Sequence, residues 1–214
     1  MNGSAEMGFA EAVQGRYSVR RYAPDRVPRE DVETMVALAT RAANAGNAQM
    51  WRFVAVQTTE VLAAMRQAVD AAFDDMLTWP ALAGRRKDVR AARAYATFFA
   101  DAPLVFAVFG LPYASRMDEL LQLGGLPAEE RLRRRQRPDL QSIGAAVQLL
   151  VTAAHALGYG ACWMTAPVVA FAEIERLLDV EPPAELLALV PVGRPAGRPR
   201  RSQRLPLDAV LSFR

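Results

Sequence analysis

A short segment near the N-terminus carries side chains suited to binding a phosphate group. It reads Arg-Tyr-Ser-Val-Arg and begins at Arg16. If the segment is extended, Arg16, Ser18 and Arg20 share a face, because side chains alternate along a strand. Two guanidinium groups and a hydroxyl can together bind a phosphate dianion. On spacing alone, the alternative is an ordinary structural role, in which they cap helices or pair with Asp25 and Glu30.

A second polar segment, residues 44–49, reads Asn-Ala-Gly-Asn-Ala-Gln and precedes a Trp-x-Phe sequence. Its amide groups can each donate and accept hydrogen bonds in one plane. Taken alone, Asn and Gly after a helix usually form a loop selected for positive φ. Together with the arginines, they could hold a ligand that has a phosphate at one end and a polar heterocycle at the other.

The composition indicates one globular domain. The chain has 214 residues, of which 52% are hydrophobic, and this content excludes disordered and fibrous proteins. The single cysteine, Cys162, excludes an intramolecular disulfide and fits a reducing compartment. The N-terminal residues lack the apolar run of a secretory signal, and no uncharged apolar run is long enough to span a bilayer. We therefore expect a soluble, cytoplasmic protein without a membrane partner.

The charge distribution does not favour a nucleic-acid partner. The net charge is +3, but acidic residues are almost as numerous as basic ones. The densest basic run, residues 131–137, follows Glu129 and Glu130 and contains no aromatic residue. Such a run is typical of a solvated helix face, and the alternative is attraction of an anionic ligand or cofactor. We expect no nucleic-acid binding.

The hydrophobic pattern predicts alternating helices and strands. Helices are expected over 9–15, from Pro28 until Gly46, over 140–157 and over 171–178. Residues 58–60 are expected to cap a further helix, and residues 68–99 to be helical with a break near Trp79. Strands are expected over 53–56, 103–109, 162–164 and 186–193. The continuous apolar run of 103–109 is typical of a central strand. Residues 115–137 look irregular and partly helical. This order allows either an α/β or an α+β fold.

Four segments, in this order, resemble the FMN-dependent nitroreductase family. The first is the basic segment that begins at Arg16, and the second keeps the family's Asn, Gln, Trp and Phe but has Met50 in place of a Pro. The third is a long helix that runs into Gly-x-Gly-x-Cys-Trp at 158–163. The fourth joins Val-Pro-Val-Gly-Arg-Pro at 190–195 to a basic tail at 201–208. Together these segments are far more specific than any one of them.

The resemblance implies an α+β fold in which a mixed, mostly antiparallel sheet is wrapped by helices. It also implies an intertwined homodimer with two FMN sites at the subunit interface. The whole chain, 1–214, would form a single FMN-binding domain. A variable, substrate-covering segment is expected at about 79–137, and a C-terminal arm at about 198–214.

The resemblance also assigns a role to each candidate site residue. The FMN phosphate and ribityl chain would be held by Arg16, Ser18, Arg20, Arg201 and Arg204, with Tyr17 beside the ring edge. The other subunit would line the flavin with Ala43, Asn44, Ala45 and Asn47, supported by Gln49. Backbone groups near flavin N5 would come from Met164, Thr165 and Ala166. Residues 95–99 offer no match to the family's contacts with the pyrimidine edge.

The activity implied by the resemblance is that of an FMN-dependent, NAD(P)H-using oxidoreductase. NADH or NADPH would pass a hydride to flavin N5, and a nitroaromatic, quinone or similar small-molecule acceptor would then take it in a ping-pong mechanism. The flavin carries this chemistry, so no catalytic side chain is expected. One Cys and one His cannot build a usual metal site. The alternatives are a flavin-binding sensing or storage protein, or a specialised enzyme of this fold for FMN cleavage, dehalogenation or azoline oxidation.

Overall fold

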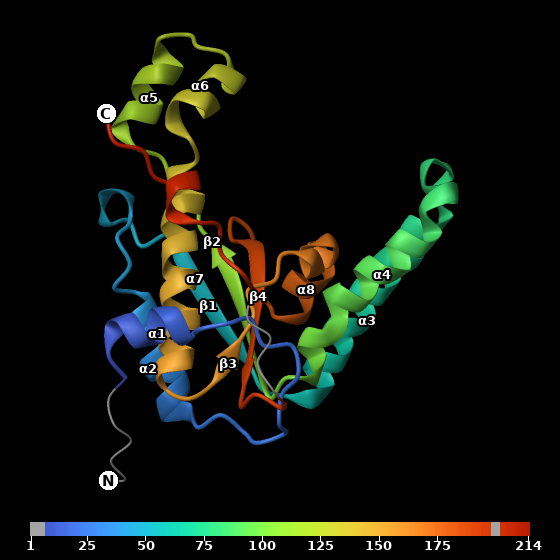
Figure 1. Ribbon diagram of the computed structural model, residues 1–214. Helices are drawn as coiled ribbons and strands as arrows, with labels where there is room; N and C mark the ends of the chain where they lie inside the picture. Colours follow the sequence, from blue (N-terminus) through green and yellow to red (C-terminus); the bar gives the residue numbers. More distant parts are fainter. Residues whose placement is uncertain (1–6, 198–201) are drawn as a thin grey trace.

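The computed structural model describes residues 7–197 and 202–214 (Figure 1). Its sheet contains β1 (Trp51–Val56), β2 (Leu104–Gly110), β3 (Gly160–Ala161) and β4 (Glu185–Gly193). The strand order is β1-β2-β4-β3, and the neighbouring strands pair antiparallel. An isolated parallel bridge joins Ser18 to Ala161 and makes the sheet mixed. These features confirm the predicted α+β fold with a mostly antiparallel sheet.

Helices cover both faces of the sheet (Figure 1). One face is covered by α2 (Arg29–Ala39) and α7 (Pro138–Ala156), and α1 (Phe9–Gly15) packs against α7. The other is covered by α3 (Thr59–Thr78), α4 (Arg86–Thr97) and α8 (Phe171–Leu177). Short 3-10 helices occur at Ala45–Asn47, Pro80–Arg85, Phe98–Asp101, Ala166–Ala170 and Leu207–Ala209.

The central strand β2 shows why its sequence is a continuous apolar run. Leu104, Phe106 and Val108 belong to the hydrophobic cluster under α7, whereas the alternate residues belong to the cluster under α3 and α8. Side chains of a strand alternate between the two faces of the sheet, and here helices cover both faces. The strand therefore has no solvent-facing side on which polar residues could alternate with apolar ones. The sheet therefore separates two hydrophobic clusters, one on each of its faces.

Two helical pairs extend away from this body (Figure 1). The pair α3 and α4 forms a long hairpin, and α5 (Arg116–Leu123) and α6 (Ala128–Arg135) form a cap beyond the start of α7. A reciprocal capping box between Ser115 and Asp118 starts α5. Most of these residues fall within 79–137, which the sequence analysis treats as a variable covering segment.

Two sequence-based boundaries were wrong. The strand expected at 162–164 lies earlier, at β3, and Met164 makes only an isolated bridge with Leu189. The helix expected until Gly46 ends at Ala39, and the chain then turns so that Ala42 packs into the core. Tertiary packing therefore overrides the apolar period at both places. Among the residues described, no helix is both long enough and apolar enough to cross a membrane.

Candidate functional site

The N-terminal basic segment runs along the edge of the sheet beside β3. It leaves α1 in an extended conformation, with φ −63° and ψ 133° at Arg16. The Val19 N–H then donates to the Ala161 carbonyl at 3.0 Å. Val19 is buried, and a Cβ at Gly160 would lie 2.3 Å from a Val19 methyl carbon. The segment can approach β3 this closely because position 160 has no side chain.

Side chains of this segment gather around Cys162, which follows β3. Burial raises the pKa of the Cys162 thiol, and the charge of Arg20, a hydrogen bond from Ser18 and the charge of Arg16 oppose that rise. All three groups therefore lie within electrostatic reach of one sulfur atom. This is the grouping that alternation along an extended segment predicts.

The basic segment lines two adjoining pockets. The first, which we call the tail pocket, has a volume of about 430 Å³ and is lined by Arg16, Tyr17, Ser18 and, from the C-terminal tail, Ser202 and Arg204. It brings together residues from the two ends of the chain. Arg201, the remaining predicted phosphate ligand, lies outside the described residues.

The second pocket, which we call the Tyr95 pocket, has a volume of about 400 Å³. Tyr17 and Ser18 line it as well, together with Arg20, Tyr95 and residues 195–197. The guanidinium carbon of Arg20 lies 6.0 Å from the centroid of the Tyr95 ring. Tyr17 and Ser18 line both pockets, so the two pockets lie next to each other along the basic segment.

Tyr95 is the lining residue that the sequence analysis missed. It lies on α4, and 65% of its surface is exposed. The available signal was a large aromatic residue on the polar side of a strongly amphipathic, Arg-rich helix.

The polar loop that follows α2 has a specific, internally bonded conformation. The Ala45 N–H donates to the Ser142 hydroxyl at 3.0 Å, and that hydroxyl donates to the Pro138 carbonyl at 2.6 Å. Within the loop, the Gln49 N–H donates to the Asn44 side-chain oxygen at 2.9 Å. The Gln49 backbone therefore contributes to the loop conformation, and the Asn44 side-chain oxygen is used within the loop.

The polar loop contains three residues with positive φ, which is the conformation that its Asn and Gly residues favour. Gly46, Asn47 and Gln49 have φ values of 61°, 49° and 48°. Asn tolerates this region because its short polar side chain can bond locally, whereas Gln49 is held there by its bond to Asn44. Ala43 and Asn47 remain exposed. The exposed Asn47 amide is therefore presented by a fixed backbone.

Within one chain, the basic segment and the polar loop lie apart. The loop is tied to Ser142, near the start of α7, whereas the ring of Tyr17 lies 6.4 Å from that of His155, near its end. These α7 residues are thirteen positions apart, which corresponds to roughly 20 Å of α-helix. The two halves of the predicted site therefore do not meet within a single subunit.

The predicted residues that follow β3 continue along β4, where Met164 pairs with Leu189 in the middle of that strand. The backbones of Met164 and Leu189 exchange two hydrogen bonds of 2.9 Å. Met164 is buried, whereas Thr165 and Ala166 are exposed where the next 3-10 helix begins. Thr165 and Ala166 therefore lie at the surface, whereas the Met164 side chain belongs to the core.

Comparisons with known proteins agree on one family. The model of the Nitroreductase family matches residues 13–194. The chain is similar to the structure of a BluB-like flavoprotein from Clostridium difficile 630, with 25% identity and a TM-score of 0.89 over 97% of this chain and 99% of that one. It also has the fold of a nitroreductase with bound FMN from Bacteroides fragilis NCTC 9343, with 18% identity and a TM-score of 0.69 over 96% and 98% of the two chains.

A curated relative matches over a shorter stretch. The CLA biosynthesis enone reductase of Lactiplantibacillus plantarum is 39% identical over 62 residues, which are 28% of this chain and 29% of that protein. The match therefore spans less than a third of the relative. The family match, in contrast, covers most of the present chain, from α1 to the end of β4. The chain belongs to the nitroreductase family.

Proposed function

We propose that this protein is an FMN-dependent oxidoreductase that takes electrons from NADH or NADPH and passes them to a small-molecule acceptor. The observation that carries the proposal is the set of cations around the tail pocket and the Tyr95 pocket. Arg16 and Arg204 line the first, and Arg20 lines the second. Family membership supports a flavin as the ligand of this region.

The residues present fit a phosphate group. Among the residues that the structure describes, Arg16, Arg20 and Arg204 have no carboxylate partner, so the pairing with Asp25 or Glu30 considered for this segment is absent there. Guanidinium groups left without a counter-ion, together with the Ser18 hydroxyl, form a donor set that matches a phosphate dianion. Arg201 remains a proposed member of this set.

We further propose that the site is completed by a homodimer. The basic segment and the polar loop are roughly 20 Å apart along α7, so a ligand that touches both needs a second copy of the chain. The C-terminal tail supports this, because its apolar residues are exposed, with 73% for Leu205 and 89% for Phe213. A partner surface would bury them, and a two-fold axis would create two equivalent sites.

In this proposal, each segment has a separate task. Arg16, Ser18, Arg20 and Arg204 bind the phosphate, while Tyr17 lies beside the ring edge. The loop with Ala43, Asn44, Ala45 and Asn47, held by Ser142, orients the flavin ring from the other subunit. The exposed backbone that follows Met164, at Thr165 and Ala166, lies near N5. Bound FMN would supply hydride transfer between the donor and the acceptor.

The acceptor class is also a proposal. Nitroaromatics and quinones follow from the family resemblance, and the partial match to an enone reductase adds activated carbon–carbon double bonds. The protein's one cysteine is a free, buried thiol, which supports a reducing compartment and hence the proposed cytoplasmic location.

Steady-state oxidation of NADH and NADPH tests the proposed activity. The FMN-loaded protein is assayed with a nitroaromatic, a quinone and an enone, and with oxygen excluded. We expect turnover with at least one acceptor and parallel double-reciprocal lines, because the donor product leaves before the acceptor binds. Bound flavin with negligible turnover for every acceptor would contradict an enzymatic role and favour storage or sensing.

A further inference from the structure

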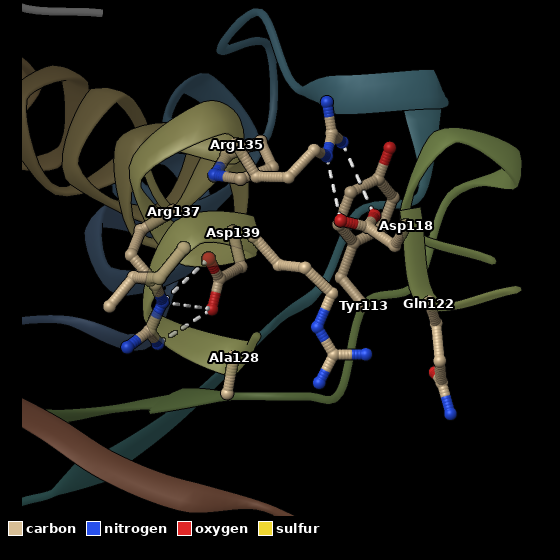
Figure 2. Close-up of a pocket in the computed structure, with 10 residues that line it drawn as sticks. Tyr113, Asp118, Gln122, Ala128, Arg135, Arg137 and Asp139 are labelled. Atoms are coloured by element: carbon tan, nitrogen blue, oxygen red, sulfur yellow. Dashed lines mark hydrogen bonds and ion pairs between the residues drawn. The ribbon is translucent and has the colours of Figure 1, made fainter. Parts of the chain in front are cut away.

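A third pocket lies between α5, α6 and the start of α7, away from the proposed phosphate region. We call it the cap pocket, and its volume is about 370 Å³ (Figure 2). Charged side chains dominate its polar lining, and three of them, Arg131, Arg135 and Arg137, come from the basic run 131–137. Asp118, Asp139 and the uncharged Tyr113 line it as well.

Two ion pairs occupy opposite sides of the cap pocket (Figure 2). Arg135 Nε lies 2.6 Å from an Asp118 oxygen, and an Arg137 nitrogen lies 2.8 Å from an Asp139 oxygen. Hydrogen bonds from Arg135 and Ser115 hold the pKa of Asp118 well below its usual range, and Arg137 lowers the pKa of Asp139. Both carboxylates are therefore ionised near neutral pH, and the two pairs cancel in charge.

Arg131 is the cation that remains. It lies one helical turn before Arg135 on α6, so both side chains project from the same face. Arg131 is half-buried, and within 7–197 and 202–214 it has no ion-pair or hydrogen-bond partner for its side chain. The lining thus carries one net positive charge. A partly desolvated cation gains most from a ligand that brings the missing negative charge.

The cap pocket adjoins the loop proposed to line the flavin. Tyr113, which lines the pocket, has its hydroxyl 3.6 Å from the position that a Cβ would take at Gly46. Gly46 lies between Asn44 and Asn47 in that loop. A small molecule held in the cap pocket would therefore have its other end beside the proposed flavin ring.

We propose that the cap pocket selects acceptors that carry a carboxylate, and that Arg131 binds this group. The inference rests on the proposed function, because it makes the pocket the anchor of the acceptor. A planar guanidinium matches a carboxylate with two parallel hydrogen bonds. A phosphate dianion fits less well, because the lining carries only one net positive charge and the second negative charge would have no counterpart there.

Ligand pairs that differ only in charge test the assignment. Benzoate and benzamide are titrated calorimetrically into the flavin-loaded protein, and KM is measured for 4-nitrobenzoate and 4-nitrobenzamide. The variants are Arg131→Gln, Arg131→Lys and, as a control, Arg133→Gln, which changes an exposed arginine on the opposite face of α6. The Arg131 side chain has no ion-pair or hydrogen-bond partner in the described part of the chain, so Arg131→Gln is expected to fold normally, which circular dichroism checks.

We expect Arg131→Gln to weaken benzoate binding and raise the KM for 4-nitrobenzoate by roughly tenfold, the loss of one charge-assisted contact. The amides should be unaffected, Arg131→Lys should recover part of the loss, and Arg133→Gln should match the parent. Three outcomes would overturn the assignment. Benzoate binding could be unchanged in Arg131→Gln, Arg133→Gln could show an equal loss, or only the KM of NADPH could rise.

The same data separate this inference from the proposed function. Selective, Arg131-dependent benzoate binding without any NADH or NADPH oxidation would support the pocket and contradict the enzyme proposal. Turnover of both nitro compounds with equal KM in the parent would support the enzyme proposal and overturn the pocket.

Discussion

Arg20 lies over the ring of Tyr95, with 6.0 Å between the guanidinium carbon and the ring centroid. The contact joins the N-terminal basic segment to the end of α4. A residue of the helical hairpin thereby helps to position one of the arginines proposed to hold phosphate. Neither the sequence pattern of the basic segment nor that of α4 could predict this contact, because the two residues are far apart in the chain.

Replacing the Tyr95 ring should weaken FMN binding slightly. Tyr95→Ala removes a cation–π contact at an exposed site, which is worth about 0.5–1 kcal/mol, or roughly a two- to fivefold rise in Kd. Tyr95→Phe keeps the ring and should bind like the parent. Quenching of FMN fluorescence on binding gives both constants. Equal losses in the two variants would assign the effect to the hydroxyl and contradict the role of the ring.

Removing a proposed phosphate ligand should have a larger effect. Arg20→Ala and Arg204→Ala are each expected to raise the Kd for FMN at least tenfold, about 1.4 kcal/mol, because each loses a charge-assisted contact. Arg29→Ala is the control, since that side chain is 90% exposed and pairs with Glu33 on α2. If both test variants bind FMN as tightly as the parent, the phosphate site is misplaced.

The extent of sequence-based prediction differs between the core and the site. The apolar run at 103–109 was sufficient to predict β2 as a central strand, because burial on both faces removes polar residues from it. The strand after α7 was placed too late. Close packing of Val19 against Gly160 decides where β3 pairs, and that contact depends on a segment distant in sequence.

The site shows the same limit. The alternation of Arg16, Ser18 and Arg20 was visible because it is local. The roles of Tyr95 and Ser142 were not visible in the sequence. Tyr95 contacts Arg20 and Ser142 accepts a hydrogen bond from Ala45, and both partners are far away in the chain. Whether the predicted loop and basic segment form one site depends on assembly, which no single-chain pattern specifies.

Loss of the Ser142 hydroxyl should destabilise the protein. Ser142→Ala leaves the Ala45 N–H without its acceptor, and a partly buried unsatisfied donor costs about 1–3 kcal/mol. Urea unfolding should show a lower midpoint with an unchanged slope. Thr34→Ala is the control, since its hydroxyl bonds a carbonyl on the exposed side of α2. Equal small effects in both variants would mean that Ser142 does not anchor the loop.

Truncation after Gly197 tests the proposed shared site. The missing tail contains Arg204 and the exposed apolar residues that a partner would cover. We expect the shortened protein to lose FMN and to shift from dimer to monomer when mass in solution and flavin content are measured together. A truncated dimer with full flavin content would refute the tail's role. A full-length monomer that holds FMN would refute the shared site.

The visible spectrum of the purified protein tests the central claim most directly. The proposed cluster of arginines would bind one phosphate, and no G-x-G-x-x-G sequence for a pyrophosphate follows a strand. The protein should therefore be yellow, show the two bands of oxidised flavin, and release FMN on denaturation. Release of FAD, or a colourless protein that does not take up added FMN, would contradict the account.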